Sequence, residues 1–158
     1  MSFHSRRCRT PRIGHAATRR HTEEVLCRWR LDADAAFVYR AQLVVSELVT
    51  NAAIAGGTLS ADERDRYHHH HPMSLTYQRL AALGQVLLRL SSDGSAYVLV
   101  EVGDQNDAPP APRIPDTECE DGRGLFPVES LCDGMGWYPT TGPDDGACKI
   151  VWARLRLS

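Results

Sequence analysis

The sequence predicts one α+β domain in which helices pack on one face of a β-sheet. Two segments in the first third have apolar residues at helical spacing, and later segments alternate apolar and polar residues. At 158 residues, with 42% hydrophobic and 24% charged residues, the chain is suited to a single hydrophobic core. Long helices followed by strands, with one helix between the strands, favour two layers.

The start of the chain is basic. We expect a flexible, solvated tail over residues 1–12 and a single domain over residues 13–158. Contact with an acidic partner is the alternative interpretation of this stretch. Its arginines are Arg6, Arg7, Arg9, Arg12, Arg19 and Arg20.

Two helices are predicted next. The first spans about Ile13 to Trp29, and Asp32 or Asp34 could cap the second, over residues 35–55. The first helix has its apolar residues at Ala16, Ala17, Val25, Leu26 and Trp29. The second has an apolar stripe at Val38, Ala41, Val45, Leu48 and Ala52, and Gly56-Gly57 ends it.

Residues 58–83 read as an insertion, with a short helix around 75–83. Its histidine run, His68 to His71, favours a solvated loop over a metal site, because adjacent histidines in an extended chain point to alternating sides.

The remaining chain predicts strands. Val86 to Leu90 and residues 96–102 form a hairpin around a Ser-Asp-Gly-Ser turn, and residues 105–123 form a Pro-rich loop. A helix over 124–132, a strand at 136–138 and a final strand over 149–157 complete the prediction.

Glu47 and Asn51 are the first candidate site residues. They lie four positions apart, so they share a helix face beside the apolar stripe. Their oxygens suit a magnesium–phosphate site, and a carboxylate can also accept the proton of a nucleophile. Ordinary helix-surface side chains are the alternative.

Asp104 ends the alternating segment Val98, Val100, Val102, so it shares their face of the predicted strand. If the valines face the core, the carboxylate needs a donor, and the amino group of adenine is one. An aspartate that caps the following loop is the alternative.

Gly122, Arg123, Gly124 and Leu125 lead into the predicted helix. Glycines at a helix start let backbone amides approach a phosphate, and the helix dipole favours the anion. A plain turn is the alternative.

In combination and order, these segments resemble the GHKL (histidine kinase-like) ATPase superfamily. They are ELVTNA at 47–52, V-x-V-x-D at 100–104, GRGL at 122–125 and KIVWARL at 149–155. The phrases VVSELVTNA, GRGL and VWARL are typical of its anti-sigma factor/serine-protein kinase branch of bacterial regulators. The resemblance covers roughly residues 13–57 and 84–158.

The resemblance implies a Bergerat-type ATP-binding fold, a two-layer α/β sandwich with helices on one face of a mostly antiparallel, mixed sheet. It implies that Asn51 holds Mg²⁺ bridging the ATP phosphates, that Glu47 is the catalytic base and that Asp104 binds the adenine amino group. Gly122, Arg123, Gly124 and Leu125 would meet the phosphates, and residues 105–123 would cover the nucleotide as a lid.

The chain departs from the family pattern at several positions. No glycine follows Asp104 within residues 105–107, and Ala108 to Pro112 is stiff. Ala55 stands where a basic residue or histidine is common. The insertion over 58–83 is longer than the usual link and could distort the pocket.

Charge and composition limit the classes of partner and the location that we expect for the protein. The net charge of −2 gives no field that favours nucleic acid or an anionic membrane, and no apolar run approaches the ~20 residues that span a bilayer. The five cysteines form no CxxC pair, so we expect neither disulfides nor zinc, and a cytoplasmic location.

The primary expectation is therefore an ATP-binding anti-sigma factor with serine-protein kinase activity. The resemblance implies a sigma factor or its antagonist as protein partner, and a possible homodimer. One alternative is a nucleotide-binding interaction module with little or no kinase activity. Another is a degenerate interaction domain that binds no nucleotide.

Overall fold

The computed structural model describes residues 6–55, 60, 62–63, 84–105, 128–140 and 147–157. Within them the chain forms five strands, two long helices and two short helical segments. In chain order these are β1 (Arg6–Ile13), η1 (His15–Ala17), α1 (Thr18–Trp29), α2 (Ala35–Ala55), β2 (Val86–Ser92), β3 (Tyr97–Asp104), α5 (Val128–Leu131), β4 (Gly134–Pro139) and β5 (Lys149–Arg156).

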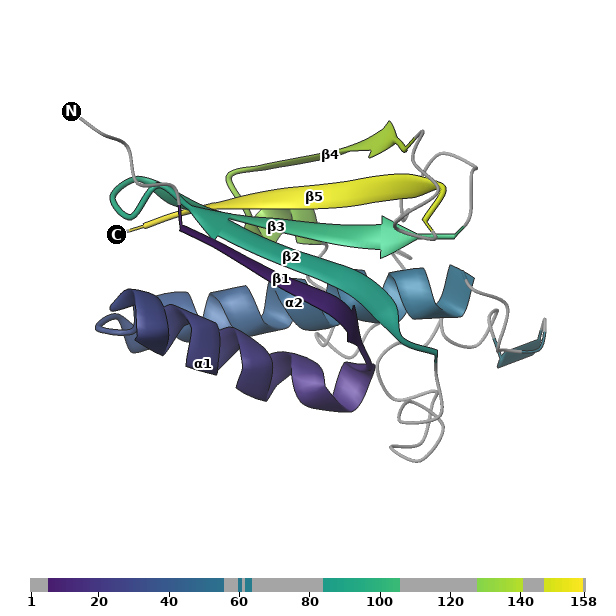
Figure 1. Ribbon diagram of the computed structural model, residues 1–158, viewed down its shortest axis with the longest axis horizontal. Helices are drawn as coiled ribbons and strands as arrows, with labels where there is room; N and C mark the ends of the chain where they lie inside the picture. Colours follow the sequence, from purple (N-terminus) through teal and green to yellow (C-terminus); the bar gives the residue numbers. More distant parts are fainter. Residues whose placement is uncertain are drawn as a thin grey trace, which may run out of the picture.

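The strands form one sheet in the order β1-β2-β3-β5-β4 (Figure 1). Helices α1 and α2 lie antiparallel to each other beneath one face of this sheet. The predicted α+β class and its helix-on-sheet layering are confirmed. The expected mixed sheet is wrong for the described strands, because all four of their pairings are antiparallel.

The first strand corrects the expected tail. Residues 6–12 belong to β1, which pairs with β2 from Arg6 opposite Ser92 to Ile13 opposite Val86. Pro11 falls where the register shifts, and edge strands tolerate both proline and charge. The segment lacks clear alternation, which is why its sequence does not predict a strand.

Helix α1 begins later than expected. Ile13 ends β1, residues 15–17 form a 3-10 turn, and Ala16 and Ala17 are exposed. Val25, Leu26 and Trp29 are buried as predicted. The helix ends at Arg30 in the left-handed conformation, φ 59°, with its N–H donating to the Cys27 carbonyl.

Helix α2 has the predicted bounds. The side chain of Asp34 caps it by accepting hydrogen bonds from the amides of Ala36, at 2.9 Å, and Phe37, at 3.2 Å. From Val44 to Ile54 every side chain is buried except those of Glu47 and Asn51. The helix is therefore enclosed on most sides, and these two polar residues mark its accessible stripe.

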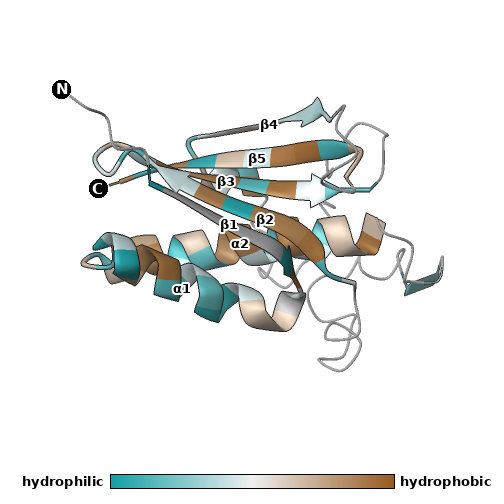
Figure 2. Ribbon diagram, viewed as in Figure 1, coloured by the Kyte–Doolittle hydropathy of each residue, from teal (hydrophilic) through white to brown (hydrophobic). Residues whose placement is uncertain are grey.

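The core lies between the helix layer and the sheet. Figure 2 shows apolar residues along the middle strands above the helices. The buried strand residues on this side are Leu88, Leu90, Val98, Val100, Val102, Ala153 and Leu155. The hairpin of β2 and β3 is confirmed, and in its turn Asp93 accepts hydrogen bonds from three backbone amides while Gly94 takes a positive φ of 81°.

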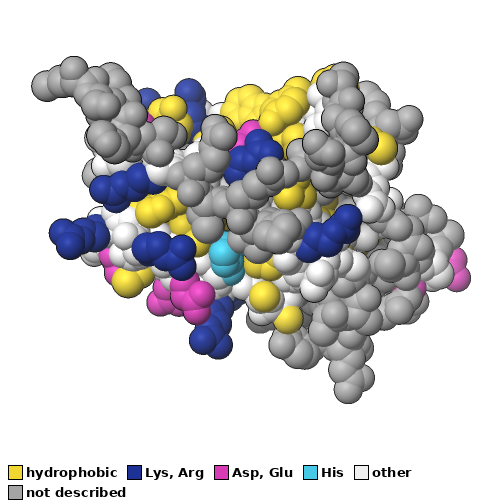
Figure 3. All heavy atoms as spheres, in the orientation of Figure 1, with side chains coloured by type: hydrophobic (Ala, Val, Ile, Leu, Met, Phe, Trp, Pro, Cys, Tyr) yellow, Lys and Arg dark blue, Asp and Glu magenta, His cyan; other side chains and the backbone are white. Residues whose placement is uncertain are grey.

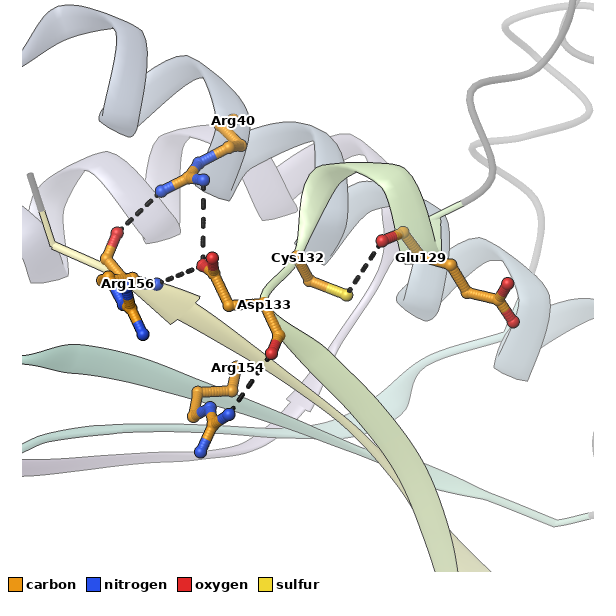
Figure 4. Close-up of polar contacts among 6 residues, drawn as sticks. All are labelled: Arg40, Glu129, Cys132, Asp133, Arg154 and Arg156. Carbon is orange, nitrogen blue, oxygen red and sulfur yellow. Dashed lines mark hydrogen bonds and ion pairs between the residues drawn. The ribbon is translucent and has the colours of Figure 1, made fainter.

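A polar junction closes one end of the two layers (Figure 4). Asp133, just before β4, accepts a hydrogen bond from the amide of Arg156 at 2.6 Å. Arg40 on α2 donates to the Arg156 carbonyl at 2.7 Å and lies 3.8 Å from the Asp133 carboxylate. These contacts join the first half of α2 to the last residues of β5.

Little of the predicted insertion is described. Ser60 and Glu63 form a reciprocal capping box, in which each side chain bonds the backbone amide of the other. The predicted helix around 75–83 lies outside the described residues. No helix among the described residues is long and apolar enough to cross a bilayer. Cys27, Cys132 and Cys148 are free thiols.

The Asp34 cap gives a stability prediction. Asp34→Ala should lower the free energy of unfolding by about 1 kcal/mol, because two amides at the start of α2 lose their acceptor. Asp34→Asn keeps a side-chain acceptor and should stay within about 0.5 kcal/mol of the wild type. Urea denaturation measures both, and equal losses in the two variants would contradict a capping role.

Candidate functional site

The second half of α2 and the end of β3 lie at the same end of the molecule. Both elements run toward the right in Figure 1, and β5 starts at that end because it is antiparallel to β3. Helix α2 also packs directly against β3. The fold therefore brings the Glu47 and Asn51 segment to the end of the sheet where Asp104 closes β3.

Glu47 and Asn51 are both partly exposed within the buried stretch of α2. Their one-turn spacing places a carboxylate and a carboxamide on the same face of the helix. Both groups offer the oxygen ligands that Mg²⁺ takes in proteins. The pair thus fits a magnesium–phosphate site by donor chemistry and by exposure.

Buried hydroxyl groups hold this part of α2 against α1. The hydroxyls of Thr18 and Ser46 lie 3.1 Å apart across the interface. Within each helix, Thr22 donates to the Thr18 carbonyl and Thr50 donates to the Ser46 carbonyl, both at 2.7 Å. These hydrogen bonds satisfy polar groups in the helix interface and fix the rotation of α2 that exposes Glu47.

Asp104 lies where the alternation of β3 predicts it. Val98, Val100 and Val102 belong to the core beneath the sheet, and Asp104 follows them on the same face. Only 7% of the residue is exposed. A carboxylate at that depth requires a partner.

The structure supplies this partner from the chain itself. Lys149, the first residue of β5, pairs directly with Asp104 across the sheet. Its ammonium nitrogen lies 3.3 Å from the Asp104 Oδ2 atom, and only 3% of Lys149 is exposed. The sequence predicts a bound adenine as the donor and gives no role to Lys149, the only lysine in the chain.

Close backbone packing fixes the strand ends around this pair. A Cβ atom on Gly103 would lie 3.0 Å from the Cβ atoms of both Leu87 and Ala147, so only glycine fits there without displacement. The amide of Cys148 donates to the Asp104 carbonyl at 2.8 Å. These contacts of Gly103 and Cys148 hold the register that sets Lys149 opposite Asp104.

The other predicted site residues cannot be placed. Gly122, Arg123, Gly124 and Leu125 lie outside the described residues, as do the histidine run and the expected lid from residue 106 onward. Of the predicted helix over 124–132, α5 accounts for Val128–Leu131. Among the described residues no group of three potential ligands could hold a metal ion.

A second polar cluster lies on the outer face of the sheet. The Tyr138 hydroxyl on β4 donates to the Glu101 carboxylate on β3 at 2.7 Å, across the intervening β5. Arg89 on β2 lies 3.5 Å from the same carboxylate. Burial and the hydrogen bond to Glu101 raise the pKa of Tyr138 to about 12. This cluster ties three strands together and has no feature of a nucleotide site.

The surface over α1 is charged rather than apolar. In Figure 3, arginines and acidic side chains gather at the lower left, over α1, whereas apolar side chains gather at the top, over β4 and β5. A shallow groove on α1 is lined by Arg20, Glu23, Glu24, Cys27, Arg28 and Asp32. Solvated charges of both signs suit the apolar face of a purine poorly.

Comparisons with protein-family models, with curated proteins and with solved structures find no match for this chain.

The buried ion pair gives a thermodynamic prediction. Lys149→Met should cost about 3–5 kcal/mol of unfolding free energy, because it leaves the Asp104 charge buried without its cation. Adding Asp104→Asn should restore part of that loss, since both buried charges are then gone. Denaturant unfolding of the two single variants and the double variant measures this coupling, and additive losses would show that the pair is not coupled.

The outer cluster gives a pH prediction. A raised tyrosine pKa favours the neutral form in the folded state, so its stabilising contribution is complete below about pH 10 and is lost as the pH rises through about 12. Ultraviolet titration should show a late-ionising tyrosine that Tyr138→Phe removes and that Glu101→Gln shifts to lower pH. Tyr39→Phe, a change at an exposed site on α2, should leave this late step in place.

Proposed function

We propose that this chain is an ATP-binding regulatory protein with a Bergerat-type nucleotide site, acting as an anti-sigma factor with serine-protein kinase activity. One observation carries the proposal. The helix that exposes Glu47 and Asn51 within a buried stretch packs against β3, which ends in the buried carboxylate of Asp104 at the same end of the molecule.

Each residue then has a distinct binding role. Asp104 accepts a hydrogen bond from the adenine amino group, and the carboxamide oxygen of Asn51 is a ligand for Mg²⁺ on the phosphates. Mg²⁺ held there would supply neutralisation of the charge that develops on the phosphates during transfer. Gly122, Arg123, Gly124 and Leu125 complete the phosphate side of the proposed site.

Phosphoryl transfer needs one more group, and Glu47 provides it. A serine hydroxyl of the partner attacks the γ-phosphorus while the bond to the β–γ bridging oxygen breaks and ADP leaves. The Glu47 carboxylate takes up the hydroxyl proton. Most of the rate enhancement comes from positioning and charge stabilisation rather than from covalent chemistry on the enzyme.

The proposed partners are a sigma factor, which the protein sequesters, and an antagonist protein, which carries the accepting serine. Nucleotide state would shift the balance between the two complexes by binding one conformation more tightly. A homodimer is part of the same proposal.

A second candidate is an interaction domain that binds no nucleotide. The Asp104–Lys149 pair favours it, because the ammonium group already satisfies the buried carboxylate. In that case the pair is purely structural. A folded sample that gives no binding heat with ATP and Mg²⁺ would support this candidate over the first.

Nucleotide binding tests the primary proposal. Asp104→Asn should weaken ATP binding by roughly 10-fold, because the neutral amide oxygen accepts a hydrogen bond from the adenine amino group that is about half as strong as that of a carboxylate. Glu101→Gln is the matched control, since Glu101 lies on the same strand but belongs to the outer-face cluster. Isothermal titration calorimetry with ATP and Mg²⁺ provides the measurement, and equal affinities for wild type and Asp104→Asn would exclude Asp104 from the site.

Phosphoryl transfer tests the role of Glu47. Glu47→Gln should bind ATP with little change but slow transfer by about 10²-fold or more, because the proton of the attacking hydroxyl loses its acceptor. Glu23→Gln, on the exposed face of α1, should transfer at the wild-type rate. Radiolabelled ATP and purified candidate antagonist proteins provide the assay, and undiminished transfer by Glu47→Gln would remove this residue from the mechanism.

A further inference from the structure

We infer that the free edge of β4 accepts an extended, acidic segment of a partner protein as a sixth strand of the sheet. One carboxylate of this segment pairs with Arg154, and an apolar side chain two positions away packs against Trp152. The inference goes beyond the proposed nucleotide site and does not depend on it, because neither residue belongs to that site.

The backbone of β4 is open on one side. This strand is the last of the described sheet, and its neighbour is β5. The amide of Thr140 donates to the Cys148 carbonyl, so every second residue from Thr140 back along β4 turns its backbone groups toward β5. Met135 and Trp137 therefore turn theirs to the free edge. Such an edge offers main-chain donors and acceptors to another strand.

Large apolar side chains flank this edge on both faces of the sheet. Trp137 lies on the helix side, in register with Val151, and is 41% exposed. Tyr138 lies on the outer face and is 40% exposed. These residues belong to the apolar surface over β4 and β5 (Figure 3). Because tryptophan, tyrosine and arginine supply most of the binding energy at protein interfaces, this composition favours a protein partner.

Two glycines leave room for the partner's side chains on the outer face. A Cβ atom on Gly134 would lie 3.5 Å from Nη2 of Arg154, and a Cβ atom on Gly136 would lie 2.8 Å from Cζ2 of Trp152. The guanidinium and indole groups of β5 thus extend over β4 toward its free edge. Side chains of an added strand that lie opposite the two glycines meet these groups directly.

The charges of this face favour an acidic segment. Arg154 donates to the Asp133 carbonyl at 3.2 Å, and no carboxylate among the described residues forms an ion pair with its guanidinium. The Asp133 carboxylate lies on the other side of the strand, beside Arg40 (Figure 4). A carboxylate of the partner forms two parallel hydrogen bonds with such a guanidinium. A second copy of β4 supplies none, because residues 134–139 contain no acidic side chain.

The test uses the peptide Gly-Thr-Val-Ile-Val-Glu-Thr-amide, labelled with fluorescein at its N-terminus, and measures its fluorescence anisotropy with the full chain. Antiparallel pairing sets its glutamate opposite Gly134 and its isoleucine opposite Gly136. The wild type should bind it with a dissociation constant on the order of 100 μM, as expected of a small interface. Absence of saturable binding up to about 1 mM overturns the inference.

The ion pair has a matched set of variants. Replacing the peptide's glutamate with glutamine should weaken binding by roughly 3- to 10-fold, because the hydrogen bonds lose their charge assistance. Arg154→Gln should weaken the glutamate peptide to the same extent and leave the glutamine peptide unchanged. Arg28→Gln, at an exposed arginine on α1, should bind both peptides like the wild type. Equal affinity of wild type and Arg154→Gln for the glutamate peptide overturns the inference.

Strand pairing has a readout of its own. The amides of the two valines face Met135 and Trp137, whereas the isoleucine amide points away from β4. Methylating the valine nitrogens should therefore abolish binding, and methylating the isoleucine nitrogen should leave it within about 3-fold of the unmodified peptide. Equal effects of the two modifications overturn the inference.

A change in β4 itself distinguishes the occupants of the edge. Met135→Pro removes an outward amide and leaves the hydrogen bonds between β4 and β5 in place, so the folded variant should lose the peptide. Peptide binding retained by the folded variant overturns the inference. A wild-type dimer that Met135→Pro converts to a monomer in sedimentation equilibrium also overturns it, because a second copy then occupies the edge. If Met135→Pro does not fold, the methylated peptides with the wild type decide.

Discussion

The antiparallel pairing of β3 with β5 is the constraint on which the candidate site depends. Because side chains alternate along β3, burying Val98, Val100 and Val102 against the helices also forces Asp104 to the helix side of the sheet. The same pairing places Lys149 directly opposite. A slip of β5 by one residue would turn Lys149 to the outer face, away from Asp104.

The burial of α2 fixes the positions of the helix residues that belong to the candidate site. A helix enclosed from Val44 to Ile54 has no freedom to rotate without breaking the core and the Thr18–Ser46 contact. Glu47 and Asn51 therefore stay on the partly exposed side of the helix. The polar residues of the candidate site are therefore positioned by apolar contacts made elsewhere in the core.

The sequence pattern predicted those parts of the fold that depend on interactions between residues close together in the chain. Helix α2 was predictable from its apolar stripe and the Asp34 cap, and the position of Asp104 followed from strand alternation. Strand β1 was not, because arginines and Pro11 hide an edge strand that is stabilised by pairing with β2. Lys149 was also missed. Aligning the valines of β3 with the apolar face of β5 would have set it opposite Asp104, but the register between these two strands is decided by long-range packing and not by local pattern.

The central claim is that Asp104 and Asn51 face one bound nucleotide, and a crystal structure with a non-hydrolysable ATP analogue and Mg²⁺ tests it most directly. The account predicts the adenine amino nitrogen within hydrogen-bonding distance of the Asp104 carboxylate and the metal ion at Asn51. A nucleotide bound elsewhere, or protein side chains that fill the space for a base beside Asp104, would contradict it.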